Sequence, residues 1–325
     1  MKKVASLLLK LVVLLMSLVV VFYFWGSNAT MEKEDYQKLF TNNYEQDFDN
    51  DSIFSIVTYN IGYLSGMTNN TTKARPKELF DRNLYHVKKE FQRLNPDVIA
   101  FQEIDYGAKR SYLINQEEEL SKLGYNHVAR TVNWDKKYVP FPYFPPSAHF
   151  GKVVSGQSIL SKFPIKNHER VVLERVENTP FYKNAFYLDR LLQIVKLEIK
   201  GKEVVVMNVH LEAFDKETRV KQLKVVVQKF LEFGQSNPTI LLGDFNSDPN
   251  FEGPAIAQVL NLENIGNAAF SESGFANTFD SKKPYKRLDY IFYTKNFISY
   301  VDGRVLSEFA QSSDHLPLSM KFMLK

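Results

Sequence analysis

The sequence predicts an α/β (α+β) fold: a four-layer α/β/β/α sandwich of two mixed β-sheets, preceded by an N-terminal transmembrane helix or signal segment. Short runs dense in Val, Ile, Leu and Phe recur along the chain and are typical of buried strands. Few helical stretches separate these runs, and several runs are adjacent in sequence. This pattern suits two mixed sheets packed face to face with helices outside. A long apolar stretch close to the N-terminus predicts the preceding helix.

The composition is that of a globular protein with enough apolar bulk for a large core. Of the 325 residues, 44% are hydrophobic, 14% aromatic and 24% charged, which excludes collagen-like, disordered and disulfide-framework classes. Cysteine is absent, so disulfides and thiolate metal sites are excluded. Removing Lys2, Lys3 and Lys10 from the 41 basic residues leaves 38 against 37 acidic ones. The chain beyond them is therefore nearly neutral, whereas a dedicated nucleic-acid binder usually has a clear basic excess.

The N-terminal segment, residues 1–29, has the length and polarity of a membrane-spanning helix. Residues 4–25 are apolar apart from Lys10 and two serines. As a helix they span roughly 33 Å, enough for the hydrocarbon core of a bilayer. Aromatic residues fill positions 22–25, as expected at a membrane interface. Lysines precede the run and acids follow it, so the positive-inside rule exports the rest of the chain.

Two alternatives for this segment remain open. An uncleaved anchor explains the length and the aromatic end, and leaves the following domain membrane-anchored and extracytoplasmic. A cleaved signal peptide, with Ser27-Asn28-Ala29 as the small-residue cleavage site, makes the protein secreted. Residues 30–52 are polar and acidic and are expected to form a linker. The folded domain is expected over residues 53–325.

Within this domain the apolar patterns predict the elements in order. Apolar spacing at Leu79, Tyr85, Val87 and Phe91 predicts a helix. Two strands flank Lys200-Gly201-Lys202 and are expected to form a hairpin. Helices are predicted over residues 76–94, 117–123 and 217–232. Strands are predicted over residues 53–59, 97–101, 156–161, 191–199, 203–210, 239–243, 288–293 and 316–323.

Residues 134–150 stand apart because prolines alternate with aromatic residues. Four prolines occupy positions 140, 142, 145 and 146. Proline fixes the backbone and cannot donate to a strand ladder, so this stretch is expected to be a loop. Its aromatic side chains either fold back onto the core or form an exposed rim that grips a lipid or an apolar part of a substrate.

Polar residues follow several of the predicted strands at the point where each strand ends. If these ends converge, their side chains meet in one site of amide, carboxylate and imidazole groups. Such a set looks like a divalent-metal phosphoesterase site. Its members are Asn60, Glu103, Asp244, Asn246, Asp314 and His315.

Seven segments, taken together and in order, resemble the endonuclease/exonuclease/phosphatase superfamily. They run from about residue 53 to the end of the chain. Taken singly, each has a structural explanation: Asn60 could be a turn residue, and residues 244–246 a helix cap or Asx turn. Only the ordered set outweighs those explanations. The segments are residues 58–60, 101–103, 156–164, 208–211, 243–246, 287–291 and 313–315.

The resemblance implies a metal centre and a side chain that orients or deprotonates the attacking water. Glu103 is expected to be the chief ligand of Mg²⁺, with Mn²⁺ as the alternative, because hard ions prefer oxygen ligands. Asn60 and Asp314 are expected to complete or support that shell. Asp244 is expected to orient or deprotonate the attacking water, and Asn246 to hold the phosphate or the transition state.

The resemblance also implies the remaining catalytic and substrate-binding residues. His315, paired with Asp289, is expected to act as the acid–base or phosphate-polarising histidine, because the carboxylate favours the charged imidazolium. His210 is expected to lie over the phosphate as a second histidine, and Arg190 to contact the phosphate as a cation. The other histidines match no motif of the family and are expected to be surface or core residues: His86, His127, His149 and His168.

The implied activity is that of an Mg²⁺-dependent phosphoric ester hydrolase acting outside the cytoplasm. The nearly neutral domain, the apolar N-terminal segment and the loop of prolines and aromatics favour a phospholipid-like or small phosphorylated substrate. The alternative is an exported or tethered nuclease. Abasic-site endonucleases carry an acid where this chain has Gly62, which argues against that branch. A non-catalytic binding module is a third class, and no obligate protein partner is expected.

Overall fold

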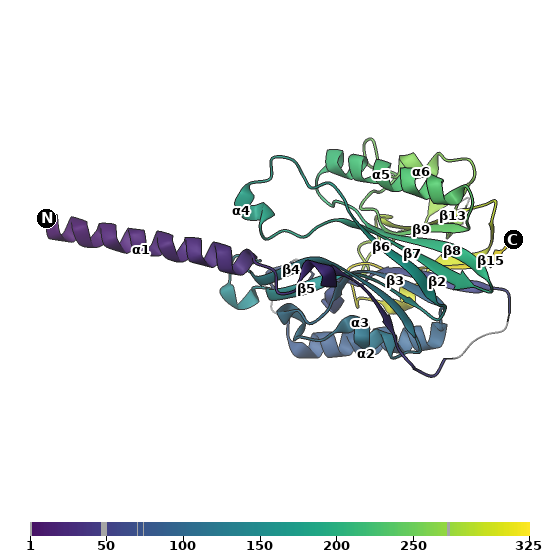
Figure 1. Ribbon diagram of the computed structural model, residues 1–325, viewed down its shortest axis with the longest axis horizontal. Coiled ribbons are helices and arrows are strands. Elements are labelled where there is room, and N and C mark those ends of the chain that lie inside the picture. Colours follow the sequence, from purple (N-terminus) through teal and green to yellow (C-terminus); the bar gives the residue numbers. More distant parts are fainter. Residues whose placement is uncertain (1, 47–50, 70, 74, 272–273) are drawn as a thin grey trace.

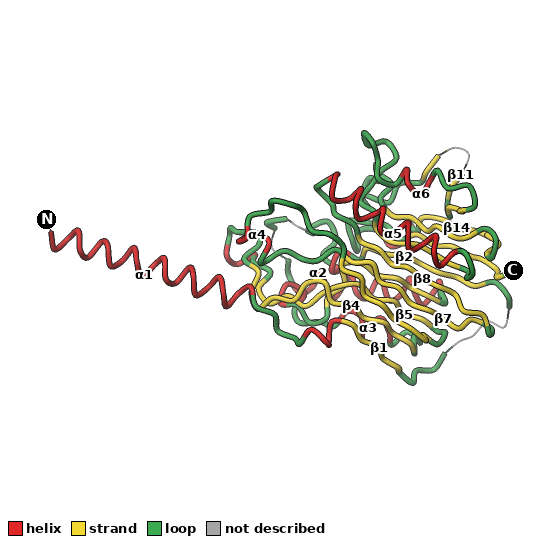
Figure 2. Tube along the Cα trace, turned by 45° about the horizontal axis from the view of Figure 1, so that its top comes forward, coloured by secondary structure: helices red, strands yellow, loops and turns green. Residues whose placement is uncertain are grey.

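The computed structural model describes residues 2–46, 51–69, 71–73, 75–271 and 274–325. Two mixed β-sheets pack face to face, and helices cover their outer faces (Figure 1). This confirms the predicted four-layer sandwich. In Figure 2 the strands form the centre of the molecule and the N-terminal helix projects away from it.

The first sheet has seven strands, of which only β2 and β3 pair in parallel. The hydrophobic runs predicted as strands lie in its centre, where both faces are covered. Its order is β1 (Gln37–Thr41), β4 (His127–Val139), β5 (Gly151–Ser161), β3 (Val98–Asp105), β2 (Phe54–Asn60), β15 (Leu318–Leu324) and β14 (Ile298–Val305).

The second sheet has six strands, and β8 and β9 form its parallel pair. The predicted hairpin around residues 200–202 is present as β7 and β8. The order is β10 (Ile265–Asn267), β13 (Asp289–Thr294), β9 (Thr239–Asp244), β8 (Lys202–His210), β7 (Leu191–Ile199) and β6 (Ile165–Val172). A separate two-stranded sheet joins β11 (Phe270–Ser271) and β12 (Gly274–Phe275).

Three hydrophobic clusters hold these layers together. One lies between the sheets and is built from the inward-facing side chains of both, such as Ile56 and Val206. The second packs α5 (Lys216–Gly234) and α6 (Ala257–Leu260) on the six-stranded sheet. The third packs α2 (Lys77–Leu94) and α3 (Gln116–Ser121) on the seven-stranded sheet. Successive side chains of a strand point to opposite faces of its sheet, so each sheet contributes to the core between the sheets and to the core beneath its helices.

Local sequence explains where the two long covering helices stop or start. The Asp215 side chain accepts a hydrogen bond from the Thr218 amide and caps α5. Asn95 ends α2 in the left-handed conformation that asparagine tolerates. The short helices are α4 (Phe181–Asn184) and the 3₁₀ turns η1 (Lys33–Tyr36), η2 (Gly62–Leu64), η3 (Lys109–Ser111), η4 (Pro146–Ala148) and η5 (Ser307–Phe309).

The N-terminal helix α1 (Lys2–Ser27) leaves the domain almost entirely exposed (Figure 1). It is long and apolar enough to cross a membrane, and only Gly26 at its end is buried. A single apolar helix of this kind is consistent with a signal peptide or an anchor.

The expectation of a polar linker over residues 30–52 is wrong in its central part. Residues 37–41 form β1, which pairs with β4 at the edge of the seven-stranded sheet. The carboxylate of Asp135 also accepts hydrogen bonds from the amides of Thr30 and Met31. Sheet pairing uses the backbone, so an edge strand needs no apolar pattern. Residues 47–50 of the expected linker lie outside the described residues.

The expected loop over residues 134–150 is also partly wrong, because residues 134–139 belong to β4. Both fates expected for its aromatic residues occur. Phe141 and Phe150 fold back onto a small cluster with Trp134. Tyr143 and Phe144 instead point to solvent, 70% and 77% exposed.

Acid should weaken this fold through a histidine buried away from the site. His168 in β6 is 8% exposed, and burial lowers its pKa from 6.5 to about 4. Between about pH 6.5 and pH 4, His168 is therefore protonated in the unfolded chain but not in the folded chain. The free energy of unfolding falls as the pH drops through this range. We expect a loss of about 2 kcal/mol by about pH 5 from this residue. Urea unfolding of wild type and His168→Gln across this range should show a smaller loss in the variant; equal losses would contradict the assignment.

Candidate active site

Four of the predicted site residues lie at one end of the strands that carry them. Asn60 is the last residue of β2, and Asp244 is the last of β9. His210 ends β8 directly opposite Asp244, and Asp289 begins β13 opposite Asp244 on its other side. Neighbouring registers in one sheet therefore place three of these side chains next to one another.

Glu103 reaches the site differently from the prediction, which placed it at the end of its strand. The strand β3 continues to Asp105, and its pairing with β5 shifts register between Phe101 and Ile104. Glu103 lies in this bulge with φ of 52°, a conformation that non-glycine residues rarely adopt. Such backbone strain is common at functional sites, where surrounding structure holds it in place.

Two carboxylates, Glu103 and Asp314, share one hydrogen-bond donor. Asn69 Nδ2 donates to Glu103 Oε2 at 2.9 Å and lies 3.3 Å from Asp314 Oδ1. Gly62 makes this approach possible, because a Cβ there would lie 2.9 Å from the Asp314 carboxylate and its φ is 52°. The two acids, distant in sequence, are therefore side by side.

Burial makes this pair of carboxylates costly when both are charged. Burial, and secondly the charge of Asp314, raise the pKa of Glu103 to about 7. Hydrogen bonding from Asn69 acts in the opposite direction. A divalent cation between the two acids would remove this repulsion, and oxygen donors are the ligands that Mg²⁺ and Mn²⁺ prefer.

His315 is held between two further carboxylates. Its Nδ1 lies 2.9 Å from Asp289 Oδ2, and its Nε2 lies 3.8 Å from Asp244 Oδ2. Burial disfavours the charged ring, but the charges of Asp289 and Asp244 outweigh it and raise the pKa of His315 well above 6.5. The two carboxylates therefore favour the charged form of the ring, whose Nδ1 faces Asp289 and whose Nε2 faces Asp244.

Asp244 is positioned by its neighbours on both oxygens. Asn60 Nδ2 donates to Oδ2 at 2.9 Å, and the backbone amide of Asn246 donates to Oδ1 at 2.9 Å. Burial raises the pKa of Asp244 to about 6, while the charge of His315 opposes that rise. A carboxylate with this pKa is ionised at neutral pH yet basic enough to take a proton.

The second histidine is neutral and paired with Arg190. Arg190 Nη1 lies 2.7 Å from His210 Nε2, and since a guanidinium can only donate, Nε2 accepts. Burial, and secondly the charge of Arg190, lower the pKa of His210 well below 6.5. Arg190 is itself buried and lies 3.4 Å from a Glu212 carboxylate oxygen. His210 Nε2 also lies 3.9 Å from Glu103 Oε1, which joins this group to the carboxylate pair.

Asn246 sits at the rim with its side-chain amide already engaged. Its Nδ2 donates to the Leu211 carbonyl at 3.0 Å. Like Glu103, it has a positive φ, here 48°. Beneath the rim, buried amides join the two sheets: Gln102 Nε2 donates to Asn208 Oδ1 at 2.6 Å, and Gln157 Nε2 donates to the Asn208 carbonyl at 3.0 Å. These contacts tie the sheet that carries Glu103 to the sheet that carries His210.

Two sets of residues offer ligand atoms to a metal ion. Asp244, Asp289 and His315 each present one within 4.8 Å of the others. In this set Asp289 Oδ2 pairs with the His315 ring, while Asp289 Oδ1 is buried without a hydrogen-bond partner. The second set consists of the Glu103 and Asp314 carboxylates, which share the Asn69 amide, together with the Asn60 side chain. It offers oxygen atoms only, and these are the ligands that a hard divalent cation prefers.

The sequence did not point to three residues that complete the site. Asn69 joins the carboxylate pair, and Glu212 and Tyr187 surround Arg190. Asn69 stands in a polar loop without a strand pattern, so nothing local marks it. Glu212 immediately follows the segment that carries His210, and this position was the only signal for it in the sequence.

The chain is similar to several known proteins. A family model described as the Endonuclease/Exonuclease/phosphatase family matches residues 57–315. "Uncharacterized protein YbhP" of Escherichia coli strain K12 is 25% identical over 233 residues, 71% of this chain and 85% of that protein.

Solved structures share the fold at low sequence identity. An endonuclease/exonuclease/phosphatase from Beutenbergia cavernae superposes with a TM-score of 0.63 at 20% identity, covering 84% of this chain and 72% of that one. The human Nocturnin catalytic domain with bound sulfate anion superposes with a TM-score of 0.59 at 18% identity, covering 91% of this chain and all of that one. The buried carboxylate and histidine residues of the candidate site all lie within residues 57–315, the region that the family model matches.

Proposed function

Because the chain belongs to the endonuclease/exonuclease/phosphatase family, we propose that it is a divalent-metal-dependent phosphoesterase that cleaves its substrate by in-line attack of water. The observation that carries this proposal is the juxtaposition of two groups. The Glu103 and Asp314 carboxylates share the Asn69 amide, and the line of Asp289, His315 and Asp244 lies beside them.

The proposed metal ligands are Glu103, Asp314 and Asn60. Mg²⁺ is the expected ion, with Mn²⁺ as the alternative, because all three side chains offer oxygen atoms. A bound cation would supply positive charge to the phosphoryl oxygens as the ester breaks. Asn69 acts as a positioning residue, since it holds both carboxylates in place.

Asp244 is the proposed acceptor of the proton of the attacking water. The water oxygen forms a bond to phosphorus while the bond from phosphorus to the leaving oxygen breaks. One proton of the water passes to Asp244, which Asn60 and the Asn246 amide hold in orientation. A raised pKa of about 6 suits a base that works near neutral pH.

His315 is the proposed cation and proton donor opposite this base. Asp289 keeps the ring charged and fixes its orientation through Nδ1, so Nε2–H is free to polarise a phosphoryl oxygen or to protonate the leaving oxygen. His210, Arg190 and Asn246 are the proposed phosphate contacts. Since His210 Nε2 accepts from Arg190, the positive charge on that side comes from the guanidinium.

The proposed substrate is a small or phospholipid-like phosphoester outside the cytoplasm. The apolar helix α1 supports a membrane-tethered protein, and the near balance of charge in the rest of the chain disfavours a polyanion. Without cleavage of α1 the protein is anchored, and with cleavage it is secreted.

Metal removal tests this function directly. Full-length protein treated with a chelator should lose at least about a hundredfold of its turnover of bis(p-nitrophenyl) phosphate or p-nitrophenyl phosphate, because the charge supplied by the ion is lost. Added Mg²⁺ or Mn²⁺ should restore it. A supercoiled plasmid belongs in the same panel. Hydrolysis that survives chelation would overturn the metal-dependent mechanism, and plasmid nicking without release of p-nitrophenol would favour the nuclease alternative.

A further inference from the structure

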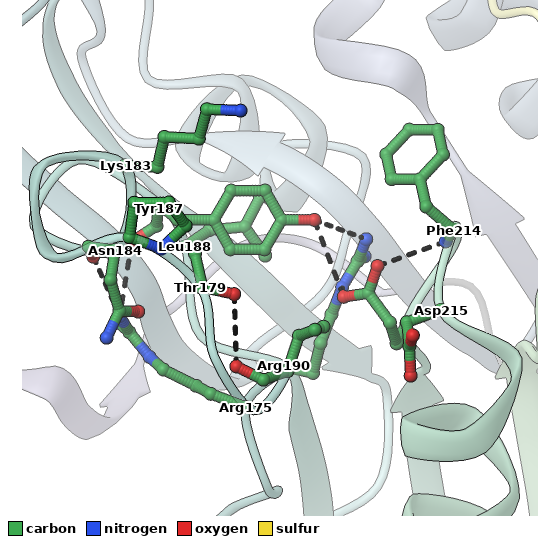
Figure 3. Close-up of a pocket in the computed structure, with 12 residues that line it drawn as sticks. Arg175, Thr179, Lys183, Asn184, Tyr187, Leu188, Arg190, Phe214 and Asp215 are labelled. Atoms are coloured by element: carbon green, nitrogen blue, oxygen red, sulfur yellow. Dashed lines mark hydrogen bonds and ion pairs between the residues drawn. The ribbon is translucent and has the colours of Figure 1, made fainter.

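A pocket of about 430 Å³ opens next to the candidate active site (Figure 3). One wall is the segment from Arg175 to Leu188, which contains α4, and the other includes Phe214 and Asp215. Arg190 and Glu212 form the boundary, since they line the pocket and Arg190 also contacts His210. A molecule whose phosphate lies at the active site can therefore extend into this pocket.

The walls of the pocket are chiefly apolar, with charge at the margin. Val176, Pro180 and Leu188 contribute aliphatic surface, and Tyr187 presents its ring. In Figure 3 the Lys183 side chain lies above that ring, and the Phe214 ring lies to its upper right. Phe214 is 87% exposed, so its ring is accessible to a molecule in the pocket. Such a lining suits the non-phosphate part of an amphipathic ester better than a second phosphate.

The same wall contacts the end of the membrane helix. The ring of Tyr23 in α1 lies 5.8 Å from that of Phe181 and 6.0 Å from that of Phe186. Gly26 packs there without a side chain, because a Cβ would lie 3.3 Å from the Phe186 ring. The backbone amide of Lys137 donates to the Asn28 carbonyl, which holds the helix end against β4. The pocket wall and the anchor are therefore one packed unit.

Exposed aromatic side chains surround this junction. Phe181 and Tyr182 in α4 are largely exposed, and so are Tyr143 and Phe144 in the loop that follows β4. They continue the aromatic end of α1, where Trp25 packs against Tyr138 with ring centroids 6.0 Å apart. Aromatic rings at the point where a spanning helix leaves the bilayer are typical of a membrane interface.

We propose that this pocket binds the non-phosphate portion of a membrane lipid phosphoester, drawn from the outer surface of the bilayer that α1 spans. The inference rests on the proposed phosphoesterase function and assigns its substrate class. Packing of α1 on the pocket wall holds the mouth at the lipid surface. The exposed aromatics sit among the head groups, and the lipid phosphate reaches the site between Arg190 and His315.

The test uses full-length protein in vesicles of phosphatidylcholine mixed with phosphatidylglycerol and supplied with Mg²⁺. Lipid products are followed by mass spectrometry, and bis(p-nitrophenyl) phosphate is assayed in parallel. Phe214→Ala should lower the ratio of lipid to soluble-ester turnover about tenfold, because a large apolar contact is lost only for the lipid. Phe181→Asp should lower the same ratio. Tyr85→Ala, an equally exposed aromatic on α2, is the matched control and should leave both activities unchanged.

The outcomes of these assays distinguish failure of the lipid-pocket proposal from failure of the phosphoesterase function. A lower ratio in both pocket variants, with the control unaffected, supports the lipid pocket. Wild-type protein that hydrolyses the soluble ester but leaves both lipids intact overturns the pocket proposal, while the phosphoesterase function stands. Wild-type protein that hydrolyses neither the lipids nor bis(p-nitrophenyl) phosphate nor p-nitrophenyl phosphate overturns the function itself. Plasmid nicking that depends on Phe214 assigns the pocket to nucleic acid and overturns the lipid proposal.

Discussion

Replacing His315 with asparagine lowers kcat for a small phosphoester by about a thousandfold, because proton transfer and charge at this position are lost together. The asparagine Nδ2 stands where the ring has Nδ1 and can still donate to Asp289, so this buried hydrogen bond is kept. The variant should therefore remain folded. Turnover of bis(p-nitrophenyl) phosphate in saturating Mg²⁺ measures the effect.

A matched histidine separates this effect from a general loss of fold. His86 on α2 donates one hydrogen bond from Nε2 to the Glu308 carbonyl and lies outside the site. His86→Asn should keep wild-type turnover. Asp289→Asn should lose activity in the same direction as His315→Asn, since it removes the carboxylate that keeps the ring charged. Wild-type turnover in His315→Asn would refute the assigned role.

Replacing Glu103 with glutamine separates activity from stability. We expect turnover to fall about a hundredfold, because the neutral amide no longer balances a divalent cation. The metal-free variant should nevertheless melt a few degrees above metal-free wild type. In wild type, burial and Asp314 make the ionised Glu103 costly, raising its pKa to about 7, and the substitution removes that cost.

Thermal unfolding with and without Mg²⁺ tests the same substitution without any substrate. A ligand that binds only the folded state raises the melting temperature. Wild type should therefore gain stability from Mg²⁺, and Glu103→Gln should gain little. Glu118→Gln, at an exposed position in α3, is the control and should respond like wild type. Equal stabilisation of Glu103→Gln and wild type would place the metal elsewhere.

The apolar patterns predicted most of the central strands and the helices that cover the sheets, but they did not predict the strands at the sheet edges. The hairpin of β7 and β8 and the helix α5 lie within one or two residues of their predicted bounds. In contrast, the edge strands β1, β6, β10 and β14 had no counterpart among the predicted strands, and neither had β4, an inner strand of the seven-stranded sheet. Edge strands such as β1 and β14 expose most of their side chains, so their sequences carry no core-facing alternation.

The site shows the same division at the level of single residues. The ordered motifs, and the resemblance that they carry, predicted Glu103, Asp244, Asp289 and His315 as site residues without any coordinates. The bulge that turns Glu103 into the site depends on how β3 pairs with β5, and a partner strand cannot be read from local sequence.

By itself, then, the amino-acid sequence determined the class of fold and the apolar helix that precedes the domain, and it predicted the polar side chains that we propose for the site. These follow from local periodicity and residue type, which act over a few positions. Three features were decided only by the tertiary structure. Asn69 joins Glu103 to Asp314, the charge of Arg190 helps to lower the pKa of His210, and α1 packs on the wall of a pocket. Each of these depends on contacts between distant segments, whose geometry is set when the two sheets pack together.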